Sequence, residues 1–241
     1  ERFTSYVVDP IKKQNLRLTV LEKDQDHVVS GYLQNASSWF PIINGVPRIM
    51  IGELKMNLLQ AHYVFFHRWK EKLPANITYD WQQAVDQIQD FDRFIKHQKK
   101  TAEYFAYEWR EIYRENNYET KNFLHFTGPY FTPEVLNGKT VVDIGCGSGR
   151  FTKQAIVCGA AVAFGTDLGE SVEVAYALTK EYDNICIVQA DIYAMPFAQT
   201  FDLAYSIGVL HHLPRPQEGF SHLPVVLKPG GKMLIWVYNR R

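Results

Sequence analysis

The second half of the chain alternates between two hydrophobic patterns. From about residue 131 onward, short runs rich in Val, Ile and Ala alternate with turns and with longer stretches of helical spacing. Because this alternation is typical of parallel strands joined by helices, it predicts the α/β class. Helices are expected at 150–158 and 171–182, with Ser171 as the N-cap of the second. The predicted strands are 141–144, 161–167, 185–191, the start of 201–213 and the end of 227–238.

The first 52 residues follow a different pattern, in which short apolar runs are separated by polar turns. Asn44-Gly45, placed between two apolar runs, is a strong hairpin signal. The pattern predicts a small β-rich module over residues 1–52. Its expected strands are 6–8, 16–20, 27–29, 31–33 and two runs within 39–50.

Residues 53–130 are helical in pattern and unusually rich in aromatic side chains. Apolar residues recur there at steps of three and four, which places them on one face of a helix. These residues are Trp81, Val85, Ile88, Phe91 and Ile95. A second aromatic group follows at 104–113, and we expect most of these rings to pack in a core.

Composition narrows the class of protein. Of the 241 residues, 46% are hydrophobic, which is enough for one large domain or two small ones. The formal net charge is zero and no basic stripe is present, which argues against a nucleic-acid partner. No apolar run approaches the roughly 20 residues that span a bilayer. Cys146, Cys158 and Cys186 have no paired spacing and are expected to be reduced and buried, as in a cytoplasmic protein.

The candidate chemistry begins in the loop after the strand at 141–144. Gly145, Gly147 and Gly149 occupy alternate positions, where they allow left-handed backbone angles and the close approach of a ligand. The following helix directs free N–H groups at this loop. Asp143 stands two residues before the first glycine, and its carboxylate would repel a pyrophosphate but suits an ammonium group. The loop therefore favours a ligand that carries an amino group.

This stretch resembles motif I of the class I S-adenosylmethionine-dependent methyltransferases. The resemblance implies a Rossmann-like, doubly wound sheet over 131–241 and S-adenosylmethionine as the cofactor. Asp167 ends the second strand, where an acid is placed to accept both ribose hydroxyl hydrogens. Asp191 ends the third and would accept the adenine amino group, while the Ile192 N–H reaches a ring nitrogen. The implied cofactor-binding residues are Asp143, Gly145, Cys146, Gly147, Gly149, Arg150, Asp167, Leu168, Asp191, Ile192, Ser206 and Ile207.

The stretch 201–213, with its doubled histidine, resembles motif IV of the same family, and 227–238 resembles its fifth strand. Pro224 departs from the family pattern and should kink or shorten the helix before that strand. His211 or His212 could take a proton from an acceptor, given an ordinary histidine pKa of about 6.5. The alternative is that both histidines are turn and packing residues.

The family fold continues with a further helix and an antiparallel hairpin after the fifth strand. Because the chain ends at Arg241, the sheet is expected to lack its last strands and to expose an edge. A missing C-terminal segment or a partner subunit would cover this edge.

The order of the N-terminal strands resembles a small zinc ribbon that precedes many methyltransferase domains. At the four cysteine positions of that family this chain has Asp9, Lys12, Asn35 and Ser38. Because a structural zinc needs four thiolate or imidazole ligands, no metal is expected. Two interpretations stay open: a metal-free interaction surface, or an ordinary β-module that packs on its neighbour.

The segment 101–109 resembles the helix that closes over the cofactor in many small-molecule methyltransferases. Ala106 stands where that motif commonly has Gly. Tyr107 and Trp109 are the candidate lid residues, with core packing as the alternative. The predicted domains are thus a β module over 1–52, a helical lid or linker over 53–130 and a cofactor-binding domain over 131–241.

The resemblance implies in-line methyl transfer to a small-molecule acceptor. Two other function classes remain. A non-catalytic scaffold that binds S-adenosylmethionine is consistent with the lost zinc ligands, and a dinucleotide-dependent oxidoreductase is disfavoured by Asp143.

Overall fold

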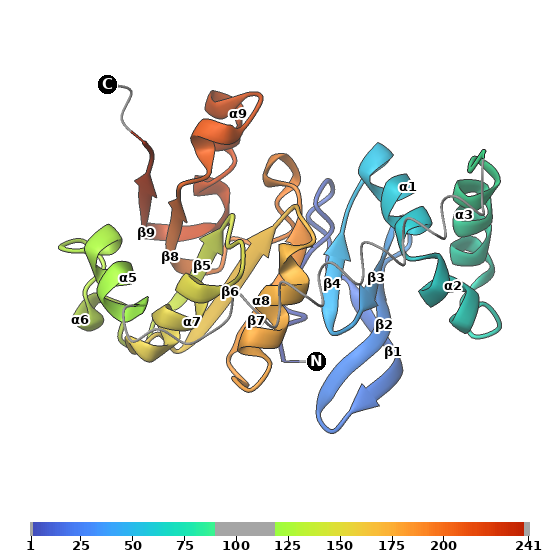
Figure 1. Ribbon diagram of the computed structural model, residues 1–241, viewed down its shortest axis with the longest axis horizontal. Coiled ribbons are helices and arrows are strands. Elements are labelled where there is room, and N and C mark those ends of the chain that lie inside the picture. Colours follow the sequence, from blue (N-terminus) through green and yellow to red (C-terminus); the bar gives the residue numbers. More distant parts are fainter. Residues whose placement is uncertain (1, 90–118, 239–241) are drawn as a thin grey trace. The chain divides into compact units, whose positions relative to one another are not determined.

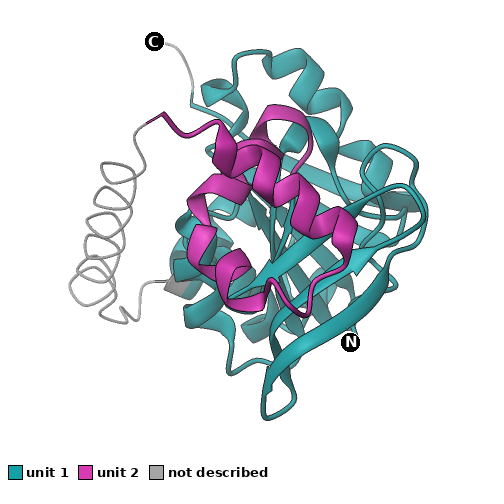
Figure 2. Cartoon of the chain, turned by 90° about the vertical axis from the view of Figure 1, so that its right-hand side faces the viewer, with its two compact units in different colours: residues 1–49, 117–241 teal, residues 50–116 magenta. Residues whose placement is uncertain are grey.

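The computed structural model describes residues 2–89 and 119–238. The chain forms two compact units, one built from residues 1–49 together with 117–241 and the other from residues 50–116 (Figure 2). The larger unit contains all the predicted cofactor-site residues.

The larger unit is built on one mixed sheet with the strand order β1-β2-β3-β4-β7-β6-β5-β8-β9 (Figure 1). Its strands are β1 (Arg17–Asp24), β2 (His27–Gln34), β3 (Trp39–Ile43), β4 (Val46–Ile49), β5 (Thr140–Ile144), β6 (Val162–Asp167), β7 (Ile185–Ala190), β8 (Phe201–Ile207) and β9 (Leu227–Trp236).

Strands β5 to β9 form the parallel part of the sheet, with β6 and β8 flanking β5. The side chains of Val141 and Val142 in β5 and of Ala163 and Phe164 in β6 have no exposed surface. Strands buried on both faces are typical of parallel sheets covered by other elements. This part of the structure confirms the predicted doubly wound α/β fold.

Helices connect these strands as the sequence predicts. The connecting elements are α7 (Arg150–Val157), α8 (Ser171–Thr179), η1 (Ile192–Ala194), η2 (Leu210–His212), α9 (Pro216–Ser221) and η3 (Pro224–Val226). The helix before β9 ends early, and a new 3₁₀ turn begins at Pro224, which confirms that this proline shortens the helix.

The prediction that Ser171 caps α8 is wrong. Ser171 is already the first helical residue, and Glu170 before it has helical backbone angles (φ −69°, ψ −5°) with no side-chain cap. An N-cap residue normally has extended backbone angles. Because the chain enters α8 from a turn that is already helical, no serine cap forms.

The N-terminal strands extend the same sheet. Where the sequence predicts two short strands, β2 is a single one, and the β3–β4 hairpin turns at Asn44 (φ 53°) and Gly45 (φ 81°), as predicted. Strand β4 then pairs in parallel with β7, with Arg48 opposite Gln189. Residues 1–49 therefore belong to the same compact unit as 117–241, although the sequence predicts a separate module over 1–52.

Strand β9 lies at the other end of the sheet. In the part of the chain that the structure describes, it pairs only with β8. Tyr238, two residues after the strand, is 63% exposed. That another subunit or a further segment covers this edge stays a prediction.

The predicted helical segment 53–130 divides between the two units. Its last part forms α5 (Glu119–Thr127), followed by α6 (Pro133–Leu136), in the larger unit. Phe123 of α5 is fully buried, with its ring centroid 5.8 Å from that of Phe151 on α7. This contact places α5 against the helix that follows the glycine loop.

The smaller unit contains α1 (Gly52–Ala61), α2 (Tyr63–Trp69) and α3 (Ala75–Asp86). Trp81 is buried, with its ring 6.2 Å from that of Phe66, which confirms it as a core residue. Ile88 follows the end of α3. Phe91, Ile95, Tyr107 and Trp109 lie outside the described residues. No helix within 2–89 or 119–238 is long and apolar enough to cross a membrane.

Candidate functional site

The glycine loop joins β5 to α7 in the predicted left-handed conformation. Gly145, Gly147 and Gly149 have φ angles of 79°, 52° and 76°. A Cβ atom on Gly145 would overlap the side chain of Val209, whereas one on Gly147 would meet no atom within 4 Å. Gly145 is therefore required by packing, while Gly147 borders open space that a ligand can enter.

Asp143 lies inside the sheet beneath this loop. Its carboxylate is 3% exposed and accepts a hydrogen bond from Thr152 Oγ1 at 2.8 Å. Burial raises its pKa to about 7, with a smaller contribution from the charge of Asp167, while the Thr152 hydrogen bond acts in the opposite direction. Asp143 therefore changes its protonation state near neutral pH.

Asp167 ends β6 and faces the glycine loop. Its Oδ2 accepts a hydrogen bond from the Gly147 N–H at 2.9 Å, and its Oδ1 accepts one from the Gly169 N–H at 2.9 Å. A carboxylate offers about four acceptor positions, so two remain for a ligand. Leu168, the next residue, is 46% exposed.

Asp191 follows β7, the next strand along the sheet. One of its oxygens accepts a hydrogen bond from the Tyr193 N–H at 3.0 Å and so caps η1. The Ile192 side chain is buried. The three acids thus lie at the carboxyl ends of the adjacent strands β5, β6 and β7, the position where ligands bind open α/β sheets.

Among the other predicted cofactor-binding residues, Ser206 and Cys146 are buried, whereas Ile207 and Arg150 are more accessible. Ser206 is buried and donates to the Ile144 carbonyl oxygen at 2.8 Å, which ties β8 to β5. Cys146 is buried as predicted, and desolvation raises the pKa of its thiol well above the ordinary value. Ile207 is half-buried, and Arg150 is exposed, with its guanidinium 4.7 Å from the centre of the Phe151 ring. From Ser206 and Cys146, only backbone groups are available to a ligand.

His211 and His212 lie on η2, just after β8, and their ring centroids are 4.1 Å apart. Neither ring nitrogen of His211 has a hydrogen-bond partner among the described residues, and both have almost no exposed surface. Partial desolvation and the neighbouring His212 lower the pKa of His211, which is therefore neutral at pH 7.

An aromatic cluster that the sequence analysis missed continues from these histidines. The ring centroid of Tyr238 lies 4.6 Å from that of His211 and 4.9 Å from that of Trp236. The Trp236 ring in turn lies 4.9 Å from the ring of Phe126 on α5. Trp236 and Tyr238 stand two residues apart, a spacing that places two side chains of an extended segment on one face. That spacing is a sequence signal for the cluster, but nothing local indicates Phe126.

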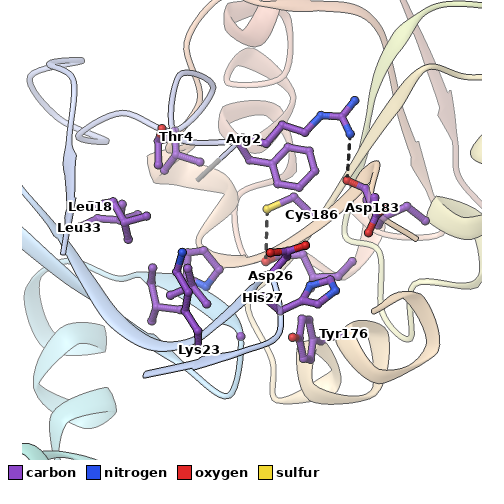
Figure 3. A pocket seen from close by; sticks show the side chains of 18 of the residues that line it. Arg2, Thr4, Leu18, Lys23, Asp26, His27, Leu33, Tyr176, Asp183 and Cys186 are labelled. Carbon is purple, nitrogen blue, oxygen red and sulfur yellow. Dashed lines mark hydrogen bonds between the residues drawn. The ribbon is translucent and has the colours of Figure 1, made fainter. Parts of the chain in front are cut away.

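A cavity of about 450 Å³ lies elsewhere in the larger unit. It is lined by N-terminal residues, by the β1–β2 hairpin and by the start of β7 (Figure 3). Cys186 lines it near the amino end of β7, whereas Asp191 follows the carboxyl end. Burial raises the pKa of Cys186 to about 12, and this thiol is half-buried rather than buried as predicted. The cavity is therefore separate from the three acids, and its thiol stays protonated at neutral pH.

The four positions that match zinc ligands form hydrogen bonds with one another. The Asp9 carboxylate accepts from the Ile11 and Lys12 N–H groups at 2.8 and 2.6 Å and from the Ser38 hydroxyl. Asn35 Oδ1 accepts from the Ser38 N–H at 2.9 Å. Burial raises the pKa of Asp9, but its hydrogen bonds outweigh this effect and the pKa is lowered overall. No group of three or more His, Cys, Asp or Glu is arranged to hold a metal ion in 2–89 or 119–238.

Residues 142–235 match the protein family described as "Methyltransferase domain". The match runs from β5 through β9 and includes the glycine loop and all three acids. This chain carries a methyltransferase domain. The domain is of the class I type, which uses S-adenosylmethionine.

Curated relatives of the methyltransferase domain differ in their named acceptors. A ubiquinone biosynthesis O-methyltransferase from Coxiella burnetii is 33% identical over 125 residues, which are 48% of this chain and 53% of that protein. A tRNA U34 carboxymethyltransferase from Hydrogenovibrio crunogenus is 25% identical over 238 residues, 92% of this chain and 63% of that protein. The chain thus spans between half and two thirds of the length of these two relatives.

The solved structures that resemble the chain include an S-adenosylmethionine-dependent methyltransferase from Mesorhizobium loti. It is 33% identical over 42% of this chain and 46% of its own length, with a TM-score of 0.38.

The residues around the glycine loop fit S-adenosylmethionine. Gly147 leaves open space beside its backbone, and Asp167 retains free acceptor positions next to it. Oxygen acceptors suit the hydroxyl and amino groups of an adenosine. Asp143, whose pKa is raised to about 7, lies beneath the same loop, and a carboxylate suits an ammonium group.

Proposed function

We propose that this chain transfers a methyl group from S-adenosylmethionine to a planar, hydroxylated small molecule. The observation that carries the proposal is the aromatic cluster in which Phe126 of α5 meets Trp236, Tyr238 and His211 at the ends of β8 and β9. Small-molecule sites are mostly apolar and aromatic with a few polar groups, and this cluster has that composition. It follows the strand next to β5, on the side away from Asp191.

The residues that would hold the cofactor divide by its chemical groups. Asp167 would accept the ribose hydroxyls, and Asp191 with the Ile192 N–H would bind the adenine. The glycine loop and Asp143 would receive the amino-acid end. When bound, the cofactor supplies an electrophilic methyl group whose bond to sulfur breaks with its electron pair left on the sulfur. The chain's contribution is alignment and the exclusion of water.

We assign His211 as the base that takes the proton of the acceptor hydroxyl. Its imidazole is neutral at pH 7 because its pKa is lowered, and both ring nitrogens lack partners within the described residues. A general base contributes about 10²- to 10⁴-fold to a rate. The proton moves from the acceptor oxygen to the imidazole as the oxygen gains the methyl group.

Transfer of radiolabelled methyl groups to a panel of hydroxylated aromatic compounds tests the proposal. We expect turnover with at least one such compound, and a fall in kcat of at least about 100-fold in His211→Ala. The matched control is His212→Ala, in which the lost ring is adjacent but His211 remains. Equal losses in both variants would contradict the assignment of His211. Cofactor binding without turnover of any acceptor would instead favour a scaffold role.

A tRNA acceptor is the second candidate function. It is favoured by the relative that aligns over 92% of this chain and is named for a tRNA substrate. The zero net charge of the chain argues against it, since nucleic-acid sites normally carry an excess of Lys and Arg. Transfer of label to unmodified tRNA, but to no small phenol, would decide for this candidate.

Tyr107 and Trp109 remain our candidates for a lid over the acceptor. Trp109→Ala should weaken cofactor or acceptor binding without lowering the melting temperature. A core tryptophan would instead cost about 3–5 kcal/mol of stability. A large loss of stability with normal cofactor affinity would end the lid proposal.

A further inference from the structure

A fully buried arginine links the N-terminal strands to the candidate cofactor site. Arg48 lies on β4 and has no exposed surface. Its Nη1 donates to Gln189 Oε1 at 2.7 Å and lies 3.4 Å from Glu170 Oε2, and its Nη2 pairs with Glu173. A buried guanidinium is tolerated only when it is paired and hydrogen-bonded, so these three partners explain its place in the core.

The partners of Arg48 surround the turn that carries Asp167. Glu170 and Glu173 stand at the start of α8, directly after this turn. Gln189, on β7, donates from Nε2 to the Leu168 carbonyl oxygen at 3.0 Å and lies 3.4 Å from Glu170 Oε1. The network thus holds the backbone at Leu168 and the side chain at Glu170, on both sides of Gly169.

Asp167 depends on the same turn. One of its oxygens accepts the Gly169 N–H at 2.9 Å, while the other accepts the Gly147 N–H of the glycine loop. If residues 168–170 move, the first of these bonds changes and the carboxylate turns with them. The orientation of Asp167 is therefore set partly by a residue of the N-terminal strands.

The N-terminal residues also hold the segment that follows Asp191. The Val8 N–H donates to the Pro196 carbonyl oxygen at 2.8 Å, and Lys13 Nζ donates to the Met195 carbonyl oxygen at 2.6 Å. Both segments that flank an adenosine in the proposed site are thus tied to residues 1–49. This agreement between two independent sets of contacts points to a role for the N-terminal strands in the site itself.

We propose that Arg48 is a positioning residue of the cofactor site, which fixes the 168–170 turn so that Asp167 faces the ribose. The inference rests on the proposed function. It assigns the N-terminal strands a role in binding the adenosine half of the cofactor.

The test measures the affinity for S-adenosylhomocysteine by calorimetry in Arg48→Lys and Gln189→Glu. Arg48→Lys keeps the charge but loses the two-nitrogen contact. Gln189→Glu keeps an acceptor for Arg48 but removes the donor to the Leu168 carbonyl. We expect each variant to bind about tenfold more weakly, which corresponds to one hydrogen bond. Arg17→Met is the matched control: Arg17 is the exposed first residue of β1, and this variant should bind like the wild type.

Combination with Asp167→Ala separates positioning from general stability. If Arg48 acts through Asp167, Arg48→Lys should cost no further affinity in the Asp167→Ala background. Equal losses in both backgrounds, or wild-type affinity in a folded Gln189→Glu, would overturn the inference. If Arg48→Lys does not fold, Gln189→Glu alone decides. Failure of the wild type to bind S-adenosylhomocysteine would refute the proposed function. If only the Arg17→Met control lost affinity while both test variants bound normally, the role of Arg48 alone would be refuted.

Discussion

Two loop regions of the larger unit use their polar groups in opposite ways. In the N-terminal loops, the Asp9 carboxylate accepts three hydrogen bonds from Ile11, Lys12 and Ser38. At the glycine loop, Asp167 accepts one bond to each oxygen, and the space beside Gly147 is open. Asp9 has three of its about four acceptor positions occupied within the protein, whereas Asp167 keeps two beside an accessible backbone.

The difference shows how a binding loop is recognised. A polar cluster with its capacity filled stabilises the chain, because each internal bond replaces a bond to water. A cluster with spare capacity next to glycines in left-handed conformations gives up stability and is suited to a ligand. The internal hydrogen bonds of Asp9 support the second interpretation left open by the sequence, a β-module that packs on its neighbour, which stays a prediction.

The largest expected effect separates two glycines of one loop. Gly145→Ala should lower the free energy of unfolding by about 2–4 kcal/mol, because it combines a left-handed backbone with an overlap of Val209. Gly147→Ala should cost only about 1 kcal/mol of stability, because its Cβ meets no protein atom. It should nevertheless weaken S-adenosylhomocysteine binding, since that Cβ enters the open space. Denaturant unfolding and calorimetry measure the two effects; equal stability losses would contradict the difference between them.

The next effect compares two aspartates directly. Asp167→Ala should weaken cofactor binding by about 1.5–3 kcal/mol, the cost of losing charged hydrogen bonds. Asp9→Ala should instead lower the free energy of unfolding by about 2–3 kcal/mol, because the part-buried N–H groups of Ile11 and Lys12 and the Ser38 hydroxyl lose their acceptor. Each variant is measured by both calorimetry and denaturant unfolding. An unchanged isotherm for Asp167→Ala would remove this residue from the proposed site.

A smaller effect tests whether the open loop receives an ammonium group. Asp143 has a pKa of about 7 in the free protein, so a cation placed near it should displace its proton. Affinity for S-adenosylhomocysteine should then rise between about pH 5 and 7, by at most about 1.4 kcal/mol per pH unit, and level off above pH 7. Calorimetry in buffers of different ionisation enthalpy measures the released proton.

Asp143→Asn is the control for this pH dependence and should bind with no proton release. The same group sets a stability slope in the free protein. Because its folded pKa lies above the unfolded value of 3.8, the folded state binds more protons, and stability should fall as the pH rises from about 4 to 7. A flat profile in the wild type would show that Asp143 is ionised throughout.

The smallest effect concerns metal binding at the N-terminal loops that carry Asp9 and Ser38. Elemental analysis should find no stoichiometric zinc, and a chelator should leave the melting temperature unchanged, because Asp9, Lys12, Asn35 and Ser38 supply no thiolate or imidazole. One tightly held zinc per chain would refute the interpretation.

The sequence by itself determined the features that are contiguous in the chain. The glycine loop follows a buried strand, and the three acids lie at or just after the ends of such strands, so a local pattern reports them. The Asn44-Gly45 turn is of the same kind, because two positive φ angles select these two residues. These signals need no knowledge of distant partners.

Only the tertiary structure decided which distant residues meet. The pairing of β4 with β7 joins positions 141 residues apart, Arg48 and Gln189, and parallel pairing of distant segments leaves no local signature. The aromatic cluster likewise forms only because Phe126 of α5 packs against Trp236 of β9, which is remote in sequence. Asp143 shows the same limit: its position was predictable, but its burial against Thr152 and its raised pKa depend on α7 packing over β5. Sequence patterns predict which groups are present, while packing between remote elements sets their direction and charge.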